Sequence, residues 1–149
     1  MKKVVVAIDG PAAAGKSTIA KLVSGLYQPW SGEVLFDGRK QSEINRDVFA
    51  NSVSIIDQNI VLFDGTIADN MRMIKEDATD EEIESAARSA HAYDFIMAMP
   101  GGFDAMLEED GANISQGQKQ LLTIARALLA DHPILILDEA TSALDARTE

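Results

Sequence analysis

The chain has 149 residues, 46% of them hydrophobic, and its 24 Asp and Glu outnumber its 13 Lys and Arg to give a net charge of −11 at pH 7. This length and apolar content predict a single domain, residues 1–149, with a real core. The acidic balance excludes a general nucleic-acid-binding face, because phosphate backbones require clustered cations. The absence of cysteine excludes disulfides and thiolate metal sites, and it favours a reducing compartment, the cytoplasm.

No apolar signal-peptide core stands at the N-terminus, and no run approaches the roughly 20 apolar residues that span a bilayer. We therefore expect any membrane role to come through a partner.

The first half of the chain predicts a strand, a loop and a helix, followed by short strands. A β-branched run over 4–8 predicts the first strand, and apolar residues at helical spacing predict a helix over 16–26. A turn at 29–32 precedes a strand at 33–36, which the turn pair Asp37-Gly38 closes. Another strand is predicted at 53–56.

Two long helices are predicted in the second half. The first covers 80–99, with Thr79 as N-cap and Glu82 completing a capping box, and the glycines that follow Pro100 stop it. The second covers 115–130 and precedes a buried parallel strand over 134–137. Its predicted buried face consists of Leu121, Ile124, Leu128 and Leu129.

A phosphate-binding loop lies between the first strand and the first helix. Gly15, Lys16 and Ser17 close a GxxxxGK[ST] pattern in the strand–loop–helix context that this motif requires. Backbone amides and the helix N-terminus would cradle the phosphates of ATP. Lys16 would reach the β- and γ-phosphates, and the Ser17 hydroxyl would ligate Mg²⁺. The predicted nucleotide-binding residues here are Gly10, Pro11, Ala12, Ala13, Ala14, Gly15, Lys16, Ser17 and Thr18.

Two carboxylates follow the last apolar strand, where the ligands of parallel sheets collect. Asp138 suits Mg²⁺, directly or through water, and Glu139 can polarise an attacking water as general base. Solvated acids at a strand end are the alternative. The phosphate loop favours the catalytic interpretation.

The run 114–120, ISQGQKQ, resembles the signature LSGGQ[RK]Q of ABC transporter nucleotide-binding domains, with Ile114 in place of Leu and Gln116 in place of the first Gly. On this run the chain from about Val23 to Glu149 is similar to such a domain of the exporter kind. The resemblance implies that the helix start holds the γ-phosphate of ATP bound by a second subunit. The residues it implies are Ser115, Gln116, Gly117 and Gln118.

Three further segments are similar to motifs of the same family. Gln58 resembles the glutamine that senses Mg²⁺ and the attacking water, which implies a catalytic and a metal-binding role. The run ending at Asp145 resembles the D-loop. The segment 107–111 stands where exporters face the transmembrane coupling helices, with Glu108 in place of the usual glycine.

The resemblance implies an α/β P-loop NTPase with a partly parallel sheet flanked by helices, incomplete relative to the family. We find no adenine-stacking aromatic ahead of the loop, and neither His91 nor His132 is placed as the family's switch histidine. In the family, the strand that carries this histidine lies between the phosphate-loop strand and the strand that corresponds to the one ending at Asp138. Without it, either these two strands are neighbours, as in nucleotide kinases, or another chain fills the gap.

The first twenty or so residues are more similar to the opening of a cytidylate-kinase-type nucleotide kinase. A junction near residues 21–24, in a fused or designed chain, is one interpretation. A kinase would need a second substrate pocket lined by arginines, and the few arginines present show no such cluster.

The predicted function is ATP binding and hydrolysis as the ATP-binding domain of an ABC-type exporter, which drives transmembrane transport by head-to-tail dimer closure. The expected partners are a second nucleotide-binding domain and a transmembrane domain, which would hold the chain at the cytoplasmic face of the membrane. Without the switch histidine, the isolated chain is expected to be weakly active or inactive. The alternatives are a P-loop nucleotide kinase and a non-catalytic or chimeric fragment that binds nucleotide.

Overall fold

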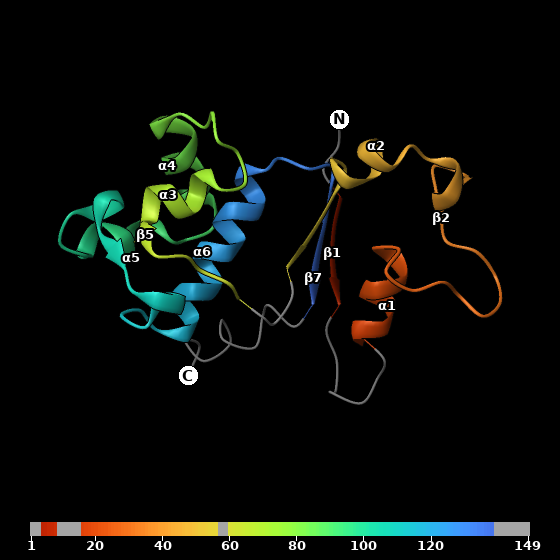
Figure 1. Ribbon diagram of the computed structural model, residues 1–149, viewed down its shortest axis with the longest axis horizontal. Helices are drawn as coiled ribbons and strands as arrows, with labels where there is room; N and C mark the ends of the chain where they lie inside the picture. The colour runs from red at the N-terminus through yellow and green to blue at the C-terminus, as the bar shows by residue number, and fades with distance from the viewer. Residues whose placement is uncertain (1–3, 9–15, 57–59, 139–149) are drawn as a thin grey trace. The chain divides into compact units, whose positions relative to one another are not determined.

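The structure is a computed structural model that describes residues 4–8, 16–56 and 60–138. These residues form two compact units (Figure 1). The first unit contains 4–8, 16–56 and 132–138, and the second contains 60–131. Each unit is described on its own below.

The first unit contains a three-stranded parallel sheet, with the α-helices and the hairpin of this unit on one side of it (Figure 1). Its strands are β1 (Val4–Ile8), β7 (Ile134–Asp138) and β4 (Val53–Ile56), in the order β1-β7-β4. All three lie at their predicted positions, and β7 extends one residue further. Strands β1 and β7 pair directly, so the phosphate-loop strand and the acidic strand are neighbours, the first of the two arrangements expected.

Helix α1 (Lys16–Val23) packs against β7 and β1. It ends three residues before the predicted Leu26, because Gly25 takes a left-handed conformation with φ of 75° and its N–H bonds back to the carbonyl of Leu22. A Cβ at Gly25 would overlap the side chain of Gln41. The close approach of Gln41 therefore requires glycine at this position.

A short hairpin and two small helical segments complete the first unit. Strands β2 (Leu35–Phe36) and β3 (Arg39–Lys40) pair across Asp37 and Gly38, which both have positive φ as a tight hairpin turn requires. Strand β2 is two residues shorter than the predicted 33–36. The segments η1 (Gln41–Glu43) and α2 (Arg46–Ala50) follow. The Phe36 and Phe49 rings pack edge to face, with 5.0 Å between their centroids.

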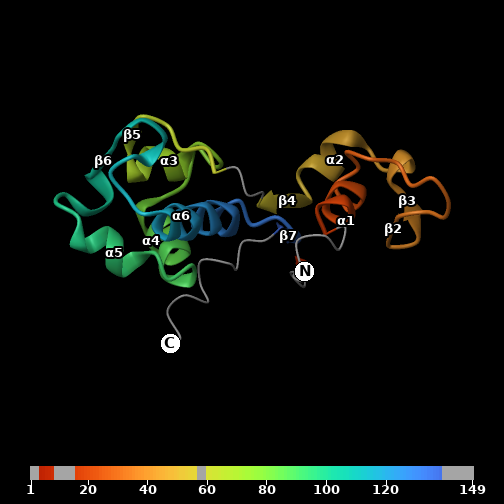
Figure 2. The same ribbon diagram turned by 90° about the horizontal axis from the view of Figure 1, so that it is seen from below.

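Helix α6 (Gln116–Leu129) is the central helix of the second unit, and α4 (Asp80–Ser89) and α3 (Ile67–Arg72) pack against it (Figures 1 and 2). The centre of its buried face is Leu122, Ala125 and Leu129. Of the predicted face, Leu129 is buried, whereas Leu121, Ile124 and Leu128 lie partly buried at the edge of the core. The apolar periodicity predicted a buried face made of large side chains, whereas the small residue Ala125 lies at the centre of the face that is buried.

The prediction of a single helix over 80–99 is wrong, because the structure has two helices in this range, α4 and α5 (Tyr93–Ala98). His91 takes a left-handed φ of 56°. The N–H of Ala92 bonds to the carbonyl of Ala87, and the N–H of His91 bonds to the carbonyl of Arg88. This is the Schellman pattern that ends a helix. Usually it has glycine where His91 stands, so the sequence carried no signal for it.

The second unit also contains a pair of short antiparallel strands, β5 (Gly65–Thr66) and β6 (Met106–Leu107). The turns η2 (Gly102–Asp104) and η3 (Glu109–Gly111) flank β6. Asn70 of α3 is buried. Its side-chain oxygen accepts from the Phe63 N–H, and its side-chain nitrogen donates to the carbonyls of Phe63 and Thr66. Among the described residues, no helix has the length and apolar character needed to cross a membrane.

Candidate functional site

The frame of the predicted nucleotide site is the carboxyl edge of the parallel sheet. Ile8, the last residue of β1, is in register with Asp138, the last residue of β7. The loop that follows β1 and the acids that end β7 therefore leave the sheet at the same edge, where parallel sheets bind ligands. The loop leads into α1 at Lys16, the position from which a helix N-terminus can face a phosphate.

Several predicted site residues lie outside the described part of the chain. They are Gly10, Pro11, Ala12, Ala13, Ala14, Gly15, Gln58, Glu139 and Asp145. For Lys16, Ser17 and Asp138 the structure describes the backbone alone, and Thr18 is exposed at the start of α1. Their roles stay predictions.

The structure describes no cluster of three or more His, Asp or Glu side chains able to hold a metal among residues 18–56 and 60–137. The predicted Mg²⁺ ligands are Ser17, Gln58 and Asp138. They offer hydroxyl, amide and carboxylate oxygens, which is the donor chemistry that Mg²⁺ prefers. This donor set fits the predicted ion.

The start of α6 is fully described, and its geometry suits an anion. Ser115 is the N-cap: its Oγ accepts from the Gln118 N–H at 3.2 Å, and the Gln118 Oε1 accepts from the Ser115 N–H at 2.8 Å. The hydroxyl of Ser115 keeps its own proton to donate. The N–H groups of Gln116 and Gly117 belong to the first turn, which has no intrahelical acceptors.

The start of this helix is exposed, and its first turn carries no acidic side chain. Ser115 and Gln116 are exposed, and a Cβ built at Gly117 meets nothing within 4 Å. The first turn of α6 contains no acidic residue, whereas α3 and α4 place Asp69 and Glu82 in their capping boxes. A neutral first turn leaves the positive end of the helix dipole available to an anion.

The loop before α6 is held by Asn113 and Gly111, for which the sequence pattern predicted no structural role of their own. Asn113 bonds through its side chain to the backbone on both sides of Leu107: its Nδ2 donates to the carbonyl of Met106 at 2.9 Å, and its Oδ1 accepts from the Glu108 N–H at 3.1 Å. Buried Gly111 has φ of 66°, and a Cβ there would lie 2.8 Å from the Leu62 Cδ1. Asn and Gly just ahead of a helix start are the sequence signal for such a turn.

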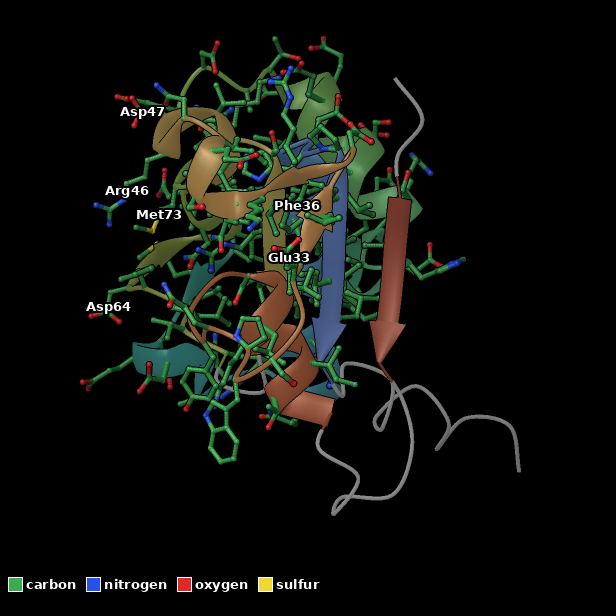
Figure 3. All side chains as sticks on the ribbon, turned by 90° about the vertical axis from the view of Figure 1, so that its right-hand side faces the viewer. Glu33, Phe36, Arg46, Asp47, Asp64 and Met73 are labelled. Carbon is green, nitrogen blue, oxygen red and sulfur yellow. The ribbon has the colours of Figure 1, made fainter. Side chains whose placement is uncertain are left out.

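A cavity of about 560 Å³ lies in the first unit. The hairpin side of its lining includes Glu33 and Lys40, which form an ion pair at 2.5 Å, and α2 contributes Arg46. Glu33 and Arg46 are labelled in Figure 3. Of the predicted site residues whose side chains the structure describes, namely Thr18 and the residues at the start of α6, none lines this cavity.

Comparisons with known proteins support the family resemblance that the sequence motifs indicated. The sequence profile of the ABC transporter family matches residues 2–142. The chain is 44% identical over 145 residues to the putative ABC transporter ATP-binding protein MG015 of Mycoplasma genitalium, and 48% identical over 145 residues to the ATP-dependent lipid A-core flippase of Pectobacterium atrosepticum. Each match covers 97% of this chain and 25% of the relative.

A solved structure of a bacterial Atm1-family ABC exporter with ATP bound superposes with a TM-score of 0.87 at 41% identity, covering 99% of this chain and 26% of that chain. The chain belongs to the ABC transporter family. The family match begins at residue 2 and so includes the phosphate loop, which favours the ABC interpretation over a nucleotide kinase. The expected α/β P-loop fold with a parallel sheet is confirmed. The chain spans about a quarter of the length of the curated relatives it matches.

Proposed function

We propose that the chain is the ATP-binding and ATP-hydrolysing part of an ABC exporter, which acts at the cytoplasmic face of a membrane through a transmembrane partner. The observation that carries the proposal is the capping box of Ser115 and Gln118, which presents a hydroxyl and two amides at an exposed helix start whose first turn has no acidic residue. This geometry supports a grip on the γ-phosphate of ATP held by the phosphate loop of a second copy or a paired domain.

The chemistry divides between two chains. In one chain, Lys16 contacts the β- and γ-phosphates, Ser17, Gln58 and Asp138 hold Mg²⁺, and Glu139 polarises the attacking water. In the other, Ser115 and Gly117 donate to the γ-phosphate, with Asp145 near the same interface. The bound Mg²⁺ would neutralise charge that develops on the transferring phosphoryl group. ATP therefore closes the dimer and hydrolysis reopens it.

The transmembrane partner is proposed to dock on the second unit beside β5 and β6. Val61 and Phe63 in the segment before β5, and Met106 in β6, are exposed apolar side chains. Asp64, which precedes β5 directly, is also exposed, and its side chain projects outward (Figure 3). Exposed apolar side chains on neighbouring segments are typical of an interaction surface. The segment 107–111, which the family resemblance assigns to partner contact, continues from β6.

Nucleotide binding is tested by calorimetry with Mg-ATP on the wild-type chain and on Lys16→Ala. The change should abolish binding, because Lys16 is the phosphate-loop cation. Lys21→Ala is the matched control: it removes a lysine of the same helix whose ammonium lies over the Tyr27 ring, 5.5 Å from its centroid. Equal ATP binding by the wild-type chain and Lys16→Ala would show that the loop is not the site.

Hydrolysis is tested by phosphate release. The isolated chain should turn ATP over slowly, because neither His91 nor His132 is placed to complete the γ-phosphate site. The residual rate should disappear in Glu139→Gln, which keeps the side-chain volume and loses the base. Formation of CDP when CMP is supplied as the acceptor would replace this proposal with the kinase alternative.

A further inference from the structure

The side chain of Asn113 joins the loop before the signature helix to strand β6. Its amide nitrogen donates to the carbonyl of Met106, and its amide oxygen accepts from the N–H of Glu108. One exposed side chain therefore satisfies two backbone groups of β6 and the residue after it. Ser115, the N-cap of α6, follows Asn113 after one buried residue, Ile114.

Strand β6 is in turn tied to the segment that carries the exposed apolar side chains. Thr66 of β5 is in register with Met106, and Gly65 is in register with Leu107. The turn between β6 and Asn113 rests on the same segment, because Gly111 leaves no room for a Cβ beside the Leu62 side chain. The loop 108–113 is thus fixed at one end by β6 and in its middle by Leu62.

We propose that Asn113 is a positioning residue that ties the signature serine, Ser115, to strand β6, so that a displacement of β6 changes the position of Ser115. The inference rests on the proposed function, which places a transmembrane partner beside β6 and a γ-phosphate at Ser115. Binding of the partner and closure of the ATP dimer would then be coupled through two hydrogen bonds of one amide. Such coupling requires an element that both sites bias, and the loop 108–113 is that element.

An amide is required at this position, because one bond uses the side chain as a donor and the other uses it as an acceptor. Asn113→Asp keeps an acceptor for the Glu108 N–H and loses the donor to Met106. Asn113→Ala loses both bonds. Asn113 is exposed, so neither change opens a cavity in the core. Asn45→Ala is the matched control: Asn45 caps α2 in the first unit by accepting from the Asp47 N–H at 2.8 Å.

The first experiment tests the coupling without nucleotide, in a double-mutant cycle on the full chain. Met106→Gly loosens the backbone of β6 without opening a cavity, because the Met106 side chain is exposed. The readout is the NMR shift of the Gln116 and Gly117 amides. We expect Met106→Gly to move both resonances in the wild-type background and in the Asn45→Ala background. In the Asn113→Ala background, the same change should leave both resonances in place. Equal movement with and without Asn113, or no movement in either, would overturn the proposal.

The second experiment measures Mg-ATP-driven association by sedimentation and ATP affinity by calorimetry. Asn113→Ala should raise the protein concentration of half-association about tenfold, the effect of losing one to two net hydrogen bonds, with Asn113→Asp intermediate or similar. The affinity of the monomer for ATP should not change, because the monomer is proposed to bind ATP through its own phosphate loop, whereas Ser115 contacts ATP only in the dimer. Asn45→Ala should change neither the association nor the ATP affinity. Unchanged association in Asn113→Ala would overturn the coupling. If the wild-type chain binds ATP but does not associate, the proposed function fails, and the NMR cycle alone decides the role of Asn113.

Discussion

The guanidinium of Arg126 donates to the backbone carbonyl of Val61 at 2.8 Å, so α6 is tied near its C-terminal end to the segment that precedes β5. The loop before the same helix is tied to β6 by Asn113. The helix that begins at the signature is therefore held at both ends to the β5–β6 side of the second unit. Burial lowers the pKa of Arg126 below its usual value, as expected for a cation that is partly removed from water.

Replacing Arg126 by methionine should destabilise the second unit. The variant keeps most of the apolar stem and leaves the Val61 carbonyl without its donor, so we expect a loss of about 1–3 kcal/mol in the free energy of unfolding. Urea denaturation followed by circular dichroism measures it. Arg39→Met is the control, since Arg39 is an exposed residue of the hairpin in the first unit. A loss no larger than that of the control would contradict the prediction.

Gly111→Ala should be strongly destabilising for its size. Alanine at a φ of 66° costs roughly 1–2 kcal/mol, and its Cβ would press on the Leu62 side chain at 2.8 Å. A thermal melt should show the loss as a lowered midpoint. Gly38→Ala separates the two causes, because Gly38 has φ of 78° but a Cβ there meets nothing within 4 Å. If both variants lose the same stability, the contact with Leu62 contributes nothing.

The sequence predicted those features that depend on residues close together in the chain. The strands β1, β4 and β7 and the starts of α4 and α6 were located by short apolar runs and by the capping residues Thr79 and Ser115. The break at His91 was missed, because the left-handed position that ends a helix in this way is usually occupied by glycine, and histidine gives no such signal.

The bonds that hold the candidate site were not predictable for a different reason. Arg126 and Asn113 bind backbone carbonyls, and any residue type supplies a carbonyl. The sequence therefore names the donor without its partner, which for Arg126 lies 65 residues away. Motif spacing predicted the phosphate loop and the signature, but it could not show that β1 and β7 pair directly.

The pH dependence of stability should include a contribution from Glu82. Hydrogen bonds from Lys75 at 2.6 Å and from the Thr79 N–H at 3.0 Å hold the pKa of Glu82 below its usual value of 4.5. A carboxylate whose pKa is lower in the folded state contributes stability above its unfolded pKa, and that contribution is lost as the pH falls through the folded value.

Glu82→Gln should therefore be less stable than the wild-type chain at pH 7, and the difference should shrink as the pH falls below about 4.5. Urea midpoints at pH 7 and at acid pH measure it. Glu81→Gln is the matched control, one residue away on the exposed side of the same helix. A difference between Glu82→Gln and the wild-type chain that is independent of pH would show that the ion pair with Lys75 does not stabilise the fold.

Gly117→Ala should separate the stability of the fold from its proposed function. Gly117 lies in the first turn of α6 with helical backbone, and a Cβ there meets nothing within 4 Å. Alanine favours a helix over glycine by up to about 1 kcal/mol, so the melting temperature of the variant should stay the same or rise. In the proposed dimer, however, the same open space holds the γ-phosphate of the opposite chain, and the added methyl group would prevent close approach of the Gly117 amide. Sedimentation should show weaker Mg-ATP-driven association, while calorimetry shows unchanged ATP binding by the monomer. A variant that is more stable and associates as tightly as the wild-type chain would place the phosphate contact elsewhere than at the start of α6.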